Sequence, residues 1–185
     1  MTRSRVLKWL RAGFWLAVAA ILALAIWFTR AGARWPSVYY MTGPSMEPTV
    51  LAHEYFLAWS PADRIEHGDL VIFRFDYEGT VYHVLRRVAG LPGDTVAMDS
   101  GVVILNGELQ RWPFRIVTPA VHRSELAIEG VLFDFGPWIV PPDSVVLLAD
   151  TRDMDGWPDS RFLSFVPLSD IEARAEVTLS GRRLP

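Results

Sequence analysis

The chain has 185 residues, enough for one domain of ordinary size plus an appendage. Hydrophobic residues make up 51% of it, and the mean hydropathy of +0.20 is high for a soluble domain. The net charge is −3, and no basic cluster lies beyond the flanks of one apolar run, which argues against nucleic acid as a partner. The chain has no cysteine, which fits a domain outside the cytoplasm without requiring one.

Much of the apolar excess lies in one run near the N-terminus, residues 12–28, which contains no charged residue. At about 1.5 Å per residue this run spans roughly 25 Å as a helix, slightly short of the ~30 Å hydrocarbon layer of a bilayer. Thr29 and the interfacial aromatic residues Trp15 and Trp27 extend it. The run predicts a transmembrane helix over residues 12–29.

A cleaved secretory signal and a buried core helix are the two alternatives. A cleaved signal needs a shorter apolar core with a small-x-small site close behind it, but Trp27, Phe28, Thr29 and Arg30 stand there. A buried core helix would usually show one polar face, and this run has none. The pattern therefore favours an uncleaved membrane anchor.

Flanking charges predict the orientation of the anchor, because basic residues favour the cytoplasmic side. Four basic residues precede the run and two follow it: Arg3, Arg5, Lys8 and Arg11, then Arg30 and Arg34. Residues 1–11 are therefore expected in the cytoplasm, residues 30–36 form a linker, and residues 37–185 form an extracytoplasmic domain.

The outer domain is predicted to be mostly β, with a coiled or barrel-like sheet. Its short runs are rich in Val, Ile, Phe and Tyr and are separated by turn signals, of which Asn106-Gly107 is the strongest hairpin signal. The expected strands cover residues 38–41, 55–59, 69–75, 80–88, 94–98, 102–105, 130–135, 145–149 and 173–179. A short helix is expected from Ser45 and a further turn near residues 168–171. Residues 110–129 lack periodicity and are interpreted as an excursion, either a lid or a flexible loop.

Four segments carry chemical information through their order and spacing. The first, residues 43–49, reads Gly-Pro-Ser-Met-Glu-Pro-Thr and follows the apolar run by about fifteen residues; taken alone it is also common as a surface turn. The second, residues 67–73, is a Gly-Asp turn that begins a strand. The third, residues 86–94, reads Arg-Arg-Val-Ala-Gly-Leu-Pro-Gly-Asp. The fourth comprises residues 149–153, 159–161 and 165–167.

In this order the four segments resemble the boxes of bacterial type I signal peptidases, and the first also looks like that of mitochondrial inner-membrane members. The resemblance covers the anchor and nearly the whole outer domain. It implies a membrane-bound serine endopeptidase that cleaves signal sequences from exported precursor proteins, with small residues at the first and third positions before the cut. It implies no metal and no cofactor.

The resemblance also assigns site residues. Ser45 stands at the position of the nucleophile, and its backbone N–H is an oxyanion candidate together with Thr42 and Gly43. The family's supporting acidic and hydroxyl box falls on Asp150, Arg152, Asp153, Asp159, Ser160 and Arg161. An ion-pair cluster that locks this loop to the barrel is the interpretation we favour for those residues.

One departure from the family bears directly on activity, because Arg86 stands where the family keeps its general-base lysine. Neutralising a free lysine at pH 7 costs about 4.6 kcal/mol, and burial brings its pKa into range. Arginine starts at a pKa of about 12.5–13.8, so it is a poor general base. His83 is an alternative base, but in an extended strand residues 83 and 86 face opposite sides unless a bulge intervenes.

The other three histidines, His53, His67 and His122, are expected to be surface or packing residues.

Two hypotheses follow from the departure at Arg86. The first is an active peptidase, which in a specialised form would serve one substrate. The second is a catalytically impaired paralogue that acts as a binding or accessory subunit in protein export. The expected partners are precursor proteins and the lipid bilayer, together with secretion machinery or an active peptidase, and no nucleic acid.

Overall fold

The computed structural model describes residues 3–30, 36–60, 64–112, 134–152 and 159–185. It divides into two compact units, Met1–Trp35 and Pro36–Pro185. The first unit contains helix α1, Arg3–Arg30, which includes the predicted apolar run. Among the described residues, no helix reaches the combination of length and apolarity that crossing a membrane requires. The transmembrane anchor over residues 12–29 therefore stays a prediction.

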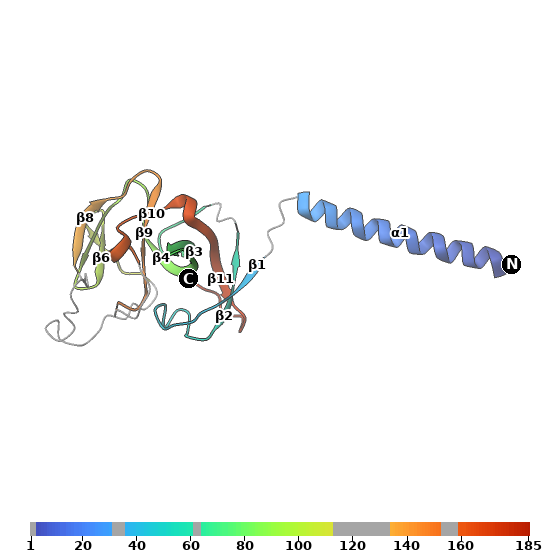
Figure 1. Ribbon diagram of the computed structural model, residues 1–185, viewed down its shortest axis with the longest axis horizontal. Coiled ribbons are helices and arrows are strands. Elements are labelled where there is room, and N and C mark those ends of the chain that lie inside the picture. Colours follow the sequence, from blue (N-terminus) through green and yellow to red (C-terminus); the bar gives the residue numbers. More distant parts are fainter. Residues whose placement is uncertain (1–2, 31–35, 61–63, 113–133, 153–158) are drawn as a thin grey trace. The chain divides into compact units, whose positions relative to one another are not determined.

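The second unit is mostly β and its strand pairs are antiparallel, which confirms the prediction of a mostly β domain (Figure 1). Within the described residues a seven-stranded sheet has the order β1-β2-β11-β3-β4-β9-β10. Its strands are β1 (Pro36–Tyr40), β2 (Tyr55–Trp59), β3 (Leu70–Tyr77), β4 (Thr80–Gly90), β9 (Ser144–Leu148), β10 (Val166–Pro167) and β11 (Ile171–Thr178). The last strand of the chain thus lies between β2 and β3.

A second sheet of four described strands has the order β7-β6-β5-β8 and lies on the opposite side of the domain from β1 and β2 (Figure 1). Its strands are β5 (Thr95–Asp99), β6 (Val102–Leu105), β7 (Glu108–Leu109) and β8 (Phe135–Ile139). Two short helices complete the described elements, α2 (Ser160–Leu163) and the 3-10 helix η1 (Leu168–Asp170).

Buried aliphatic side chains on both faces of β3 and β4 hold the domain together. Ile72 and Leu85 belong to one apolar cluster with the turn after β1, whereas Phe73 and Val84 belong to another with β9. Burying both faces of these strands stabilises the fold by roughly 25 cal/mol for each Å² of apolar surface removed from water. The central pair β3–β4 is therefore a rigid support for side chains that project from it.

The Asn106-Gly107 signal produces the predicted hairpin, in which β6 pairs with β7. Both residues have positive φ, 53° and 84°, as a type I′ turn requires. The Asn106 amide also donates to Asp94 at 2.9 Å and accepts from the Thr95 backbone N–H at 2.9 Å. The turn is therefore tied to the start of β5 as well as to its own strands.

Replacing Asn106 by Ala should lower the free energy of unfolding by about 1–3 kcal/mol, because two hydrogen bonds are lost and alanine disfavours the left-handed backbone. Urea unfolding followed by circular dichroism measures the change. Glu78→Ala is the matched control, since Glu78 also has positive φ (51°), in the turn between β3 and β4. An equal loss in both variants would show that the Asn106 amide contacts contribute nothing.

One predicted element is absent from the described part of the structure. The short helix expected from Ser45 is wrong, because residues 45–49 form a turn. Residues 130–133 of the strand expected over residues 130–135 lie outside the described part, and the described strand β8 covers Phe135–Ile139. Of the excursion at 110–129, residues 113–129 also lie outside it. The turn predicted near residues 168–171 is confirmed as η1.

Candidate active site

Ser45 lies in the turn that joins β1 to β2. The turn is closed by backbone hydrogen bonds from Glu47 N–H to Pro44 O and from Val50 N–H to Met46 O, each 2.9 Å long. The side chains of Met46 and Val50 are completely buried in the apolar cluster beneath it. Ser45 itself stays half-buried. The buried side chains of Met46 and Val50 therefore fix the turn, whereas Ser45 stays accessible.

Thr151, just after β9, clamps this turn from the other side. Its backbone N–H donates to Ser45 O at 3.0 Å, and its hydroxyl lies 3.0 Å from both Pro44 O and Glu47 O. The side chain is nearly buried, so these contacts replace water for carbonyl groups of the turn. The sequence includes Thr151 only as a member of the fourth segment, residues 149–153, and its positioning role was missed.

Replacing Thr151 by Val, which has nearly the same shape, should cost about 1–3 kcal/mol of stability because buried carbonyl groups lose their donor. Thr151→Ser should restore it. Urea unfolding gives the stability, and the matched control is Thr80→Val at an exposed position of β4, which should change it by less than about 0.5 kcal/mol. A Thr151→Val protein as stable as Thr151→Ser would contradict the clamp.

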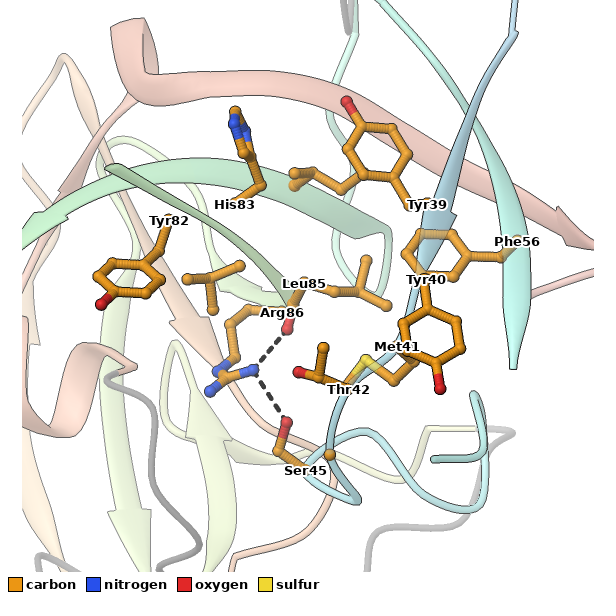
Figure 2. Close-up of a pocket in the computed structure, with 13 residues that line it drawn as sticks. Tyr39, Tyr40, Met41, Thr42, Ser45, Phe56, Tyr82, His83, Leu85 and Arg86 are labelled. Carbon is orange, nitrogen blue, oxygen red and sulfur yellow. Dashed lines mark hydrogen bonds between the residues drawn. The ribbon is translucent and has the colours of Figure 1, made fainter. Parts of the chain in front are cut away.

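Arg86 of β4 reaches Ser45 from the central sheet (Figure 2). Its Nη1 donates to Ser45 Oγ at 3.1 Å and to Leu85 O at 2.6 Å, and only 1% of the residue is exposed. A guanidinium group can only donate hydrogen bonds, so the Ser45 oxygen is the acceptor and its own O–H proton can point elsewhere. The structure therefore brings together the two residues that the resemblance pairs.

Burial lowers the pKa of Arg86 to about 10, while the carboxylates of Asp159 and Asp150 act in the opposite direction and Arg161 adds to the lowering. Loss of hydration disfavours the charged form, and this effect exceeds the support from the carboxylates. At pH 7 about one guanidinium in a thousand is neutral at that pKa. Arg86 is thus a cation at neutral pH and accepts a proton readily only in alkaline solution.

His83 is directed away from Ser45 (Figure 2). Its Nδ1 lies 2.6 Å from Glu172 Oε2, and half of its side chain is exposed. The side chain that donates a hydrogen bond to Ser45 is Arg86. The role of His83 as an alternative general base stays a prediction. His53 contacts the Tyr40 hydroxyl at 2.7 Å and His67 contacts Asp94 at 2.6 Å. His122 lies outside the described residues.

Arg87, next to Arg86, forms a buried ion pair with Asp150. Its Nε and Nη2 donate to Asp150 at 2.7 and 2.5 Å, and its Nη1 donates to Gly68 O at 2.6 Å. Thr49 lies between them, since its hydroxyl donates to Asp150 and accepts from Arg87 Nη2 at 3.0 Å. The bidentate pair therefore ties the Ser45 turn, through Thr49, to β4 and to the end of β9.

Asp159 and Arg161 form the next part of this buried group. Arg161 Nη2 donates to Asp159 Oδ2 at 2.8 Å, and the same carboxylate accepts from Ala149 N–H at 3.0 Å. Burial by itself would raise the pKa of Asp159, but the hydrogen bonds and charge of Arg161, with the charge of Arg86, hold that pKa below its ordinary value. Asp159 is therefore ionised and bound on several sides.

The remaining supporting residues also lie in this group. Arg152 Nη1 donates to Ala149 O, and burial lowers the pKa of Arg152 to about 10. The Ser160 hydroxyl accepts from Leu147 N–H at 2.8 Å. Asp153, the last supporting residue that the sequence singled out, lies outside the described part. The described members bond to Leu147 of β9, to Ala149 just after it, to one another and, through Asp150, to Arg87 of β4; a locking cluster stays our interpretation of them.

A cavity of about 320 Å³ opens over Ser45 and Arg86. Thr42 and Gly43, the other oxyanion candidates, line it beside the serine. Much of the remaining wall is apolar or aromatic, with Tyr39 and Phe56 stacked at a ring-centroid distance of 5.8 Å. A cavity of this size and lining accepts a short apolar segment and presents the Ser45 hydroxyl and the buried Arg86 cation to it.

A serine on a packed turn, within hydrogen-bond distance of a basic side chain at the wall of an apolar cavity, resembles the arrangement of serine peptidases. The family model described as "Signal peptidase, peptidase S26" matches residues 7–180. The chain therefore belongs to the signal peptidase family, peptidase S26, a family of serine endopeptidases.

Similar proteins bear names from the same family. The chain is 30% identical over 176 residues to the probable signal peptidase I-2 of Synechocystis, a match that covers 91% of this chain and 72% of that relative. It is 30% identical over 155 residues to signal peptidase I of Bacillus licheniformis, with 81% and 76% covered. A solved signal peptidase I from Enterococcus faecalis is 20% identical, with a TM-score of 0.44 and coverage of 62% of this chain and 98% of that one.

Proposed function

We propose that this protein is an endopeptidase that cleaves signal sequences from exported precursor proteins, with Ser45 as nucleophile. The observation that carries the proposal is the 3.1 Å hydrogen bond between Arg86 Nη1 and Ser45 Oγ at the wall of the cavity. Names of the similar proteins support the same substrate class. The apolar and aromatic cavity wall would bind the segment before the cut as an extended strand.

In this proposal Ser45 Oγ attacks the scissile carbonyl carbon while a neutral Arg86 takes the hydroxyl proton. The resulting guanidinium then returns that proton to the leaving amine, so that the C–N bond breaks and an ester to Ser45 remains for water to hydrolyse. The Ser45 backbone N–H, with Thr42 and Gly43 beside it, would stabilise the oxyanion. Neutralising Arg86 at pH 7 costs about 4 kcal/mol, three pH units below a pKa of about 10.

We further propose that residues 12–29 anchor the protein in the bilayer. The uncharged run of residues 12–28 and the basic residues before it support an N-terminus in the cytoplasm and residues 37–185 outside. In that arrangement the serine lies a short linker away from the membrane. The substrate, which is itself tethered by its apolar signal segment, would reach the site from the bilayer surface.

The second candidate function is a catalytically impaired paralogue that binds precursors, as a subunit beside the secretion machinery or an active peptidase. One observation favours it: burial leaves the pKa of Arg86 at about 10, so the residue that contacts Ser45 is charged at neutral pH. A charged guanidinium holds the serine oxygen but cannot take its proton.

Cleavage of a precursor with an Ala-x-Ala site, by the purified full chain in detergent, tests the first candidate. We expect slow cleavage by the wild type at pH 7 and none by Ser45→Ala. Arg86→Lys should cleave about a hundredfold faster, since lysine starts about two pH units lower than arginine. The matched control is Arg174→Lys, which changes a partly exposed arginine of β11 that does not line the cavity. A wild type that is inert at every pH, with an active Arg86→Lys, would establish the second candidate instead.

A further inference from the structure

The chain folds back on itself after β11 and brings Arg182 to the segment that follows Ser45. Gly181 has a positive φ of 86°, which permits a tight turn, and its N–H donates to Thr178 O at 2.9 Å. The Thr178 N–H donates in turn to Arg182 O at 2.9 Å. Backbone hydrogen bonds within this turn therefore fix the point from which the Arg182 side chain extends.

The Arg182 guanidinium bonds to two points of the segment between Ser45 and β2. Its Nη1 donates to the Thr49 carbonyl oxygen at 2.5 Å, and its Nη2 donates to Glu54 Oε2 at 2.7 Å. Thr49 is nearly buried, and carbonyl groups of buried residues are normally bonded to a donor. A hydrogen bond from a charged donor is about twice as strong as one between neutral groups. Arg182 thus supplies Thr49 with a strong, directed contact.

Thr49 is held from two sides as a result. Its hydroxyl donates to Asp150 and accepts from Arg87 Nη2 at 3.0 Å, and these two residues form one buried ion pair. Its carbonyl oxygen is held by Arg182, whose side chain is 43% exposed. Removing a side chain that is so exposed opens no buried cavity, so its loss should free the carbonyl end of Thr49 without unfolding the domain.

We propose that Arg182 is a positioning residue for Ser45 and acts through the Thr49 carbonyl. Thr49 is the last residue of the turn that carries Ser45, whose Oγ lies 3.1 Å from Arg86 Nη1. A shift of the turn by about 0.5 Å would lengthen this contact beyond hydrogen-bond distance. The role of Ser45 as nucleophile rests on the proposed function, whereas the position of its turn is measurable without any cleavage.

Hydrogen exchange of the full chain in detergent, followed by mass spectrometry, tests the positioning directly. Arg182→Met keeps most of the side-chain length without the donors, and the amide hydrogens of residues 45–50 should exchange about tenfold faster than in the wild type. Exchange in β3 and β4 should change by less than about twofold. Arg182→Lys, which keeps a charged donor, should restore most of the protection. The matched control is Arg183→Met, at an adjacent arginine that lines a different cavity beside Asp69.

Cleavage kinetics with the Ala-x-Ala precursor provide the second readout. Arg182→Met should lower kcat about tenfold and leave KM within about twofold of the wild type, because a misplaced nucleophile slows the chemical step rather than substrate binding. Arg182→Lys should recover most of kcat, and Arg183→Met should match the wild type.

Unchanged exchange over residues 45–50 in Arg182→Met would overturn the inference, as would an Arg182→Met protein that retains the kcat of an active wild type. An unfolded variant, or one whose exchange accelerates equally through β3 and β4, would show a role in overall stability and also overturn it. An Arg182→Lys protein no better than Arg182→Met would exclude the charged contact as the cause. If the wild type itself is inert toward the precursor, only the proposed endopeptidase activity is refuted, because the exchange of residues 45–50 still decides whether Arg182 positions the turn.

Discussion

Cleavage of a precursor by the wild-type protein should accelerate about tenfold for each unit of pH from 7 to 9 and level off near pH 10. The reason is that the proposed mechanism needs Arg86 in its neutral form, and burial lowers the pKa of that group to about 10. Below the pKa the neutral fraction grows tenfold per pH unit, and above it nearly every molecule carries the base. The total increase is on the order of a thousandfold.

Initial rates with a saturating precursor, measured in overlapping buffers of constant ionic strength, give this profile. Arg86→Lys serves as the matched variant, and its profile should level off about two pH units lower. A wild-type rate that instead levels off near pH 7 would contradict Arg86 as the base, because that pH dependence is typical of a histidine. His83, which now contacts Glu172, would then be the residue to replace next.

Replacing Asp159 by Asn should lower the free energy of unfolding by about 3–5 kcal/mol. The carboxylate is 1% exposed, accepts two different backbone N–H groups and binds Arg161. Asparagine removes the charge and turns one acceptor into a donor, which leaves the buried Arg161 cation without its closest compensating charge. Thermal or urea unfolding at pH 7 measures the loss.

Glu176→Gln is the control, since it breaks an ion pair with Arg174 that is 35–43% exposed and should cost less than about 1 kcal/mol. The effect of Asp159→Asn also depends on pH. The pKa of Asp159 is held below its ordinary value in the folded protein, so its charge stabilises the fold above about pH 4 and this contribution is lost as acid protonates it. A difference between wild type and variant that stays constant down to pH 2 would contradict that assignment.

Local signals predicted individual elements of the fold well. The spans of β2 and β6 agree with the structure at both ends, because a run of apolar and aromatic residues lies between clear turn residues. Such local signals could not predict the order of the strands within the sheet. The insertion of β11 between β2 and β3 depends on which faces must be buried together, and no short-range pattern encodes that requirement. The two-residue strand β10 is likewise too short for any periodicity.

Individual residues of the site could be predicted from the sequence, but the contacts that position them could not. Ser45 and Arg86 were found from the motif order, and the structure places them in hydrogen-bond contact. A short helix was expected from Ser45, but the burial of Met46 and Val50 is satisfied by a tight turn. Thr151 carried no signal of its role, because a threonine after a strand has many ordinary uses. Only its contact with a turn more than a hundred residues earlier reveals it.

The insertion of β11 between β2 and β3 determines when the site can form during synthesis of the chain. β11 is the strand that bridges β2, which follows the Ser45 turn, and β3, which carries β4 and Arg86 beside it. As the chain is made from its N-terminus, the strands beside Ser45 and Arg86 are therefore joined through the sheet only when residues 171–178 have been made. Closing contacts over such long separations is slow and entropically costly. A nascent molecule should accordingly stay inert toward other emerging chains until β11 has been made.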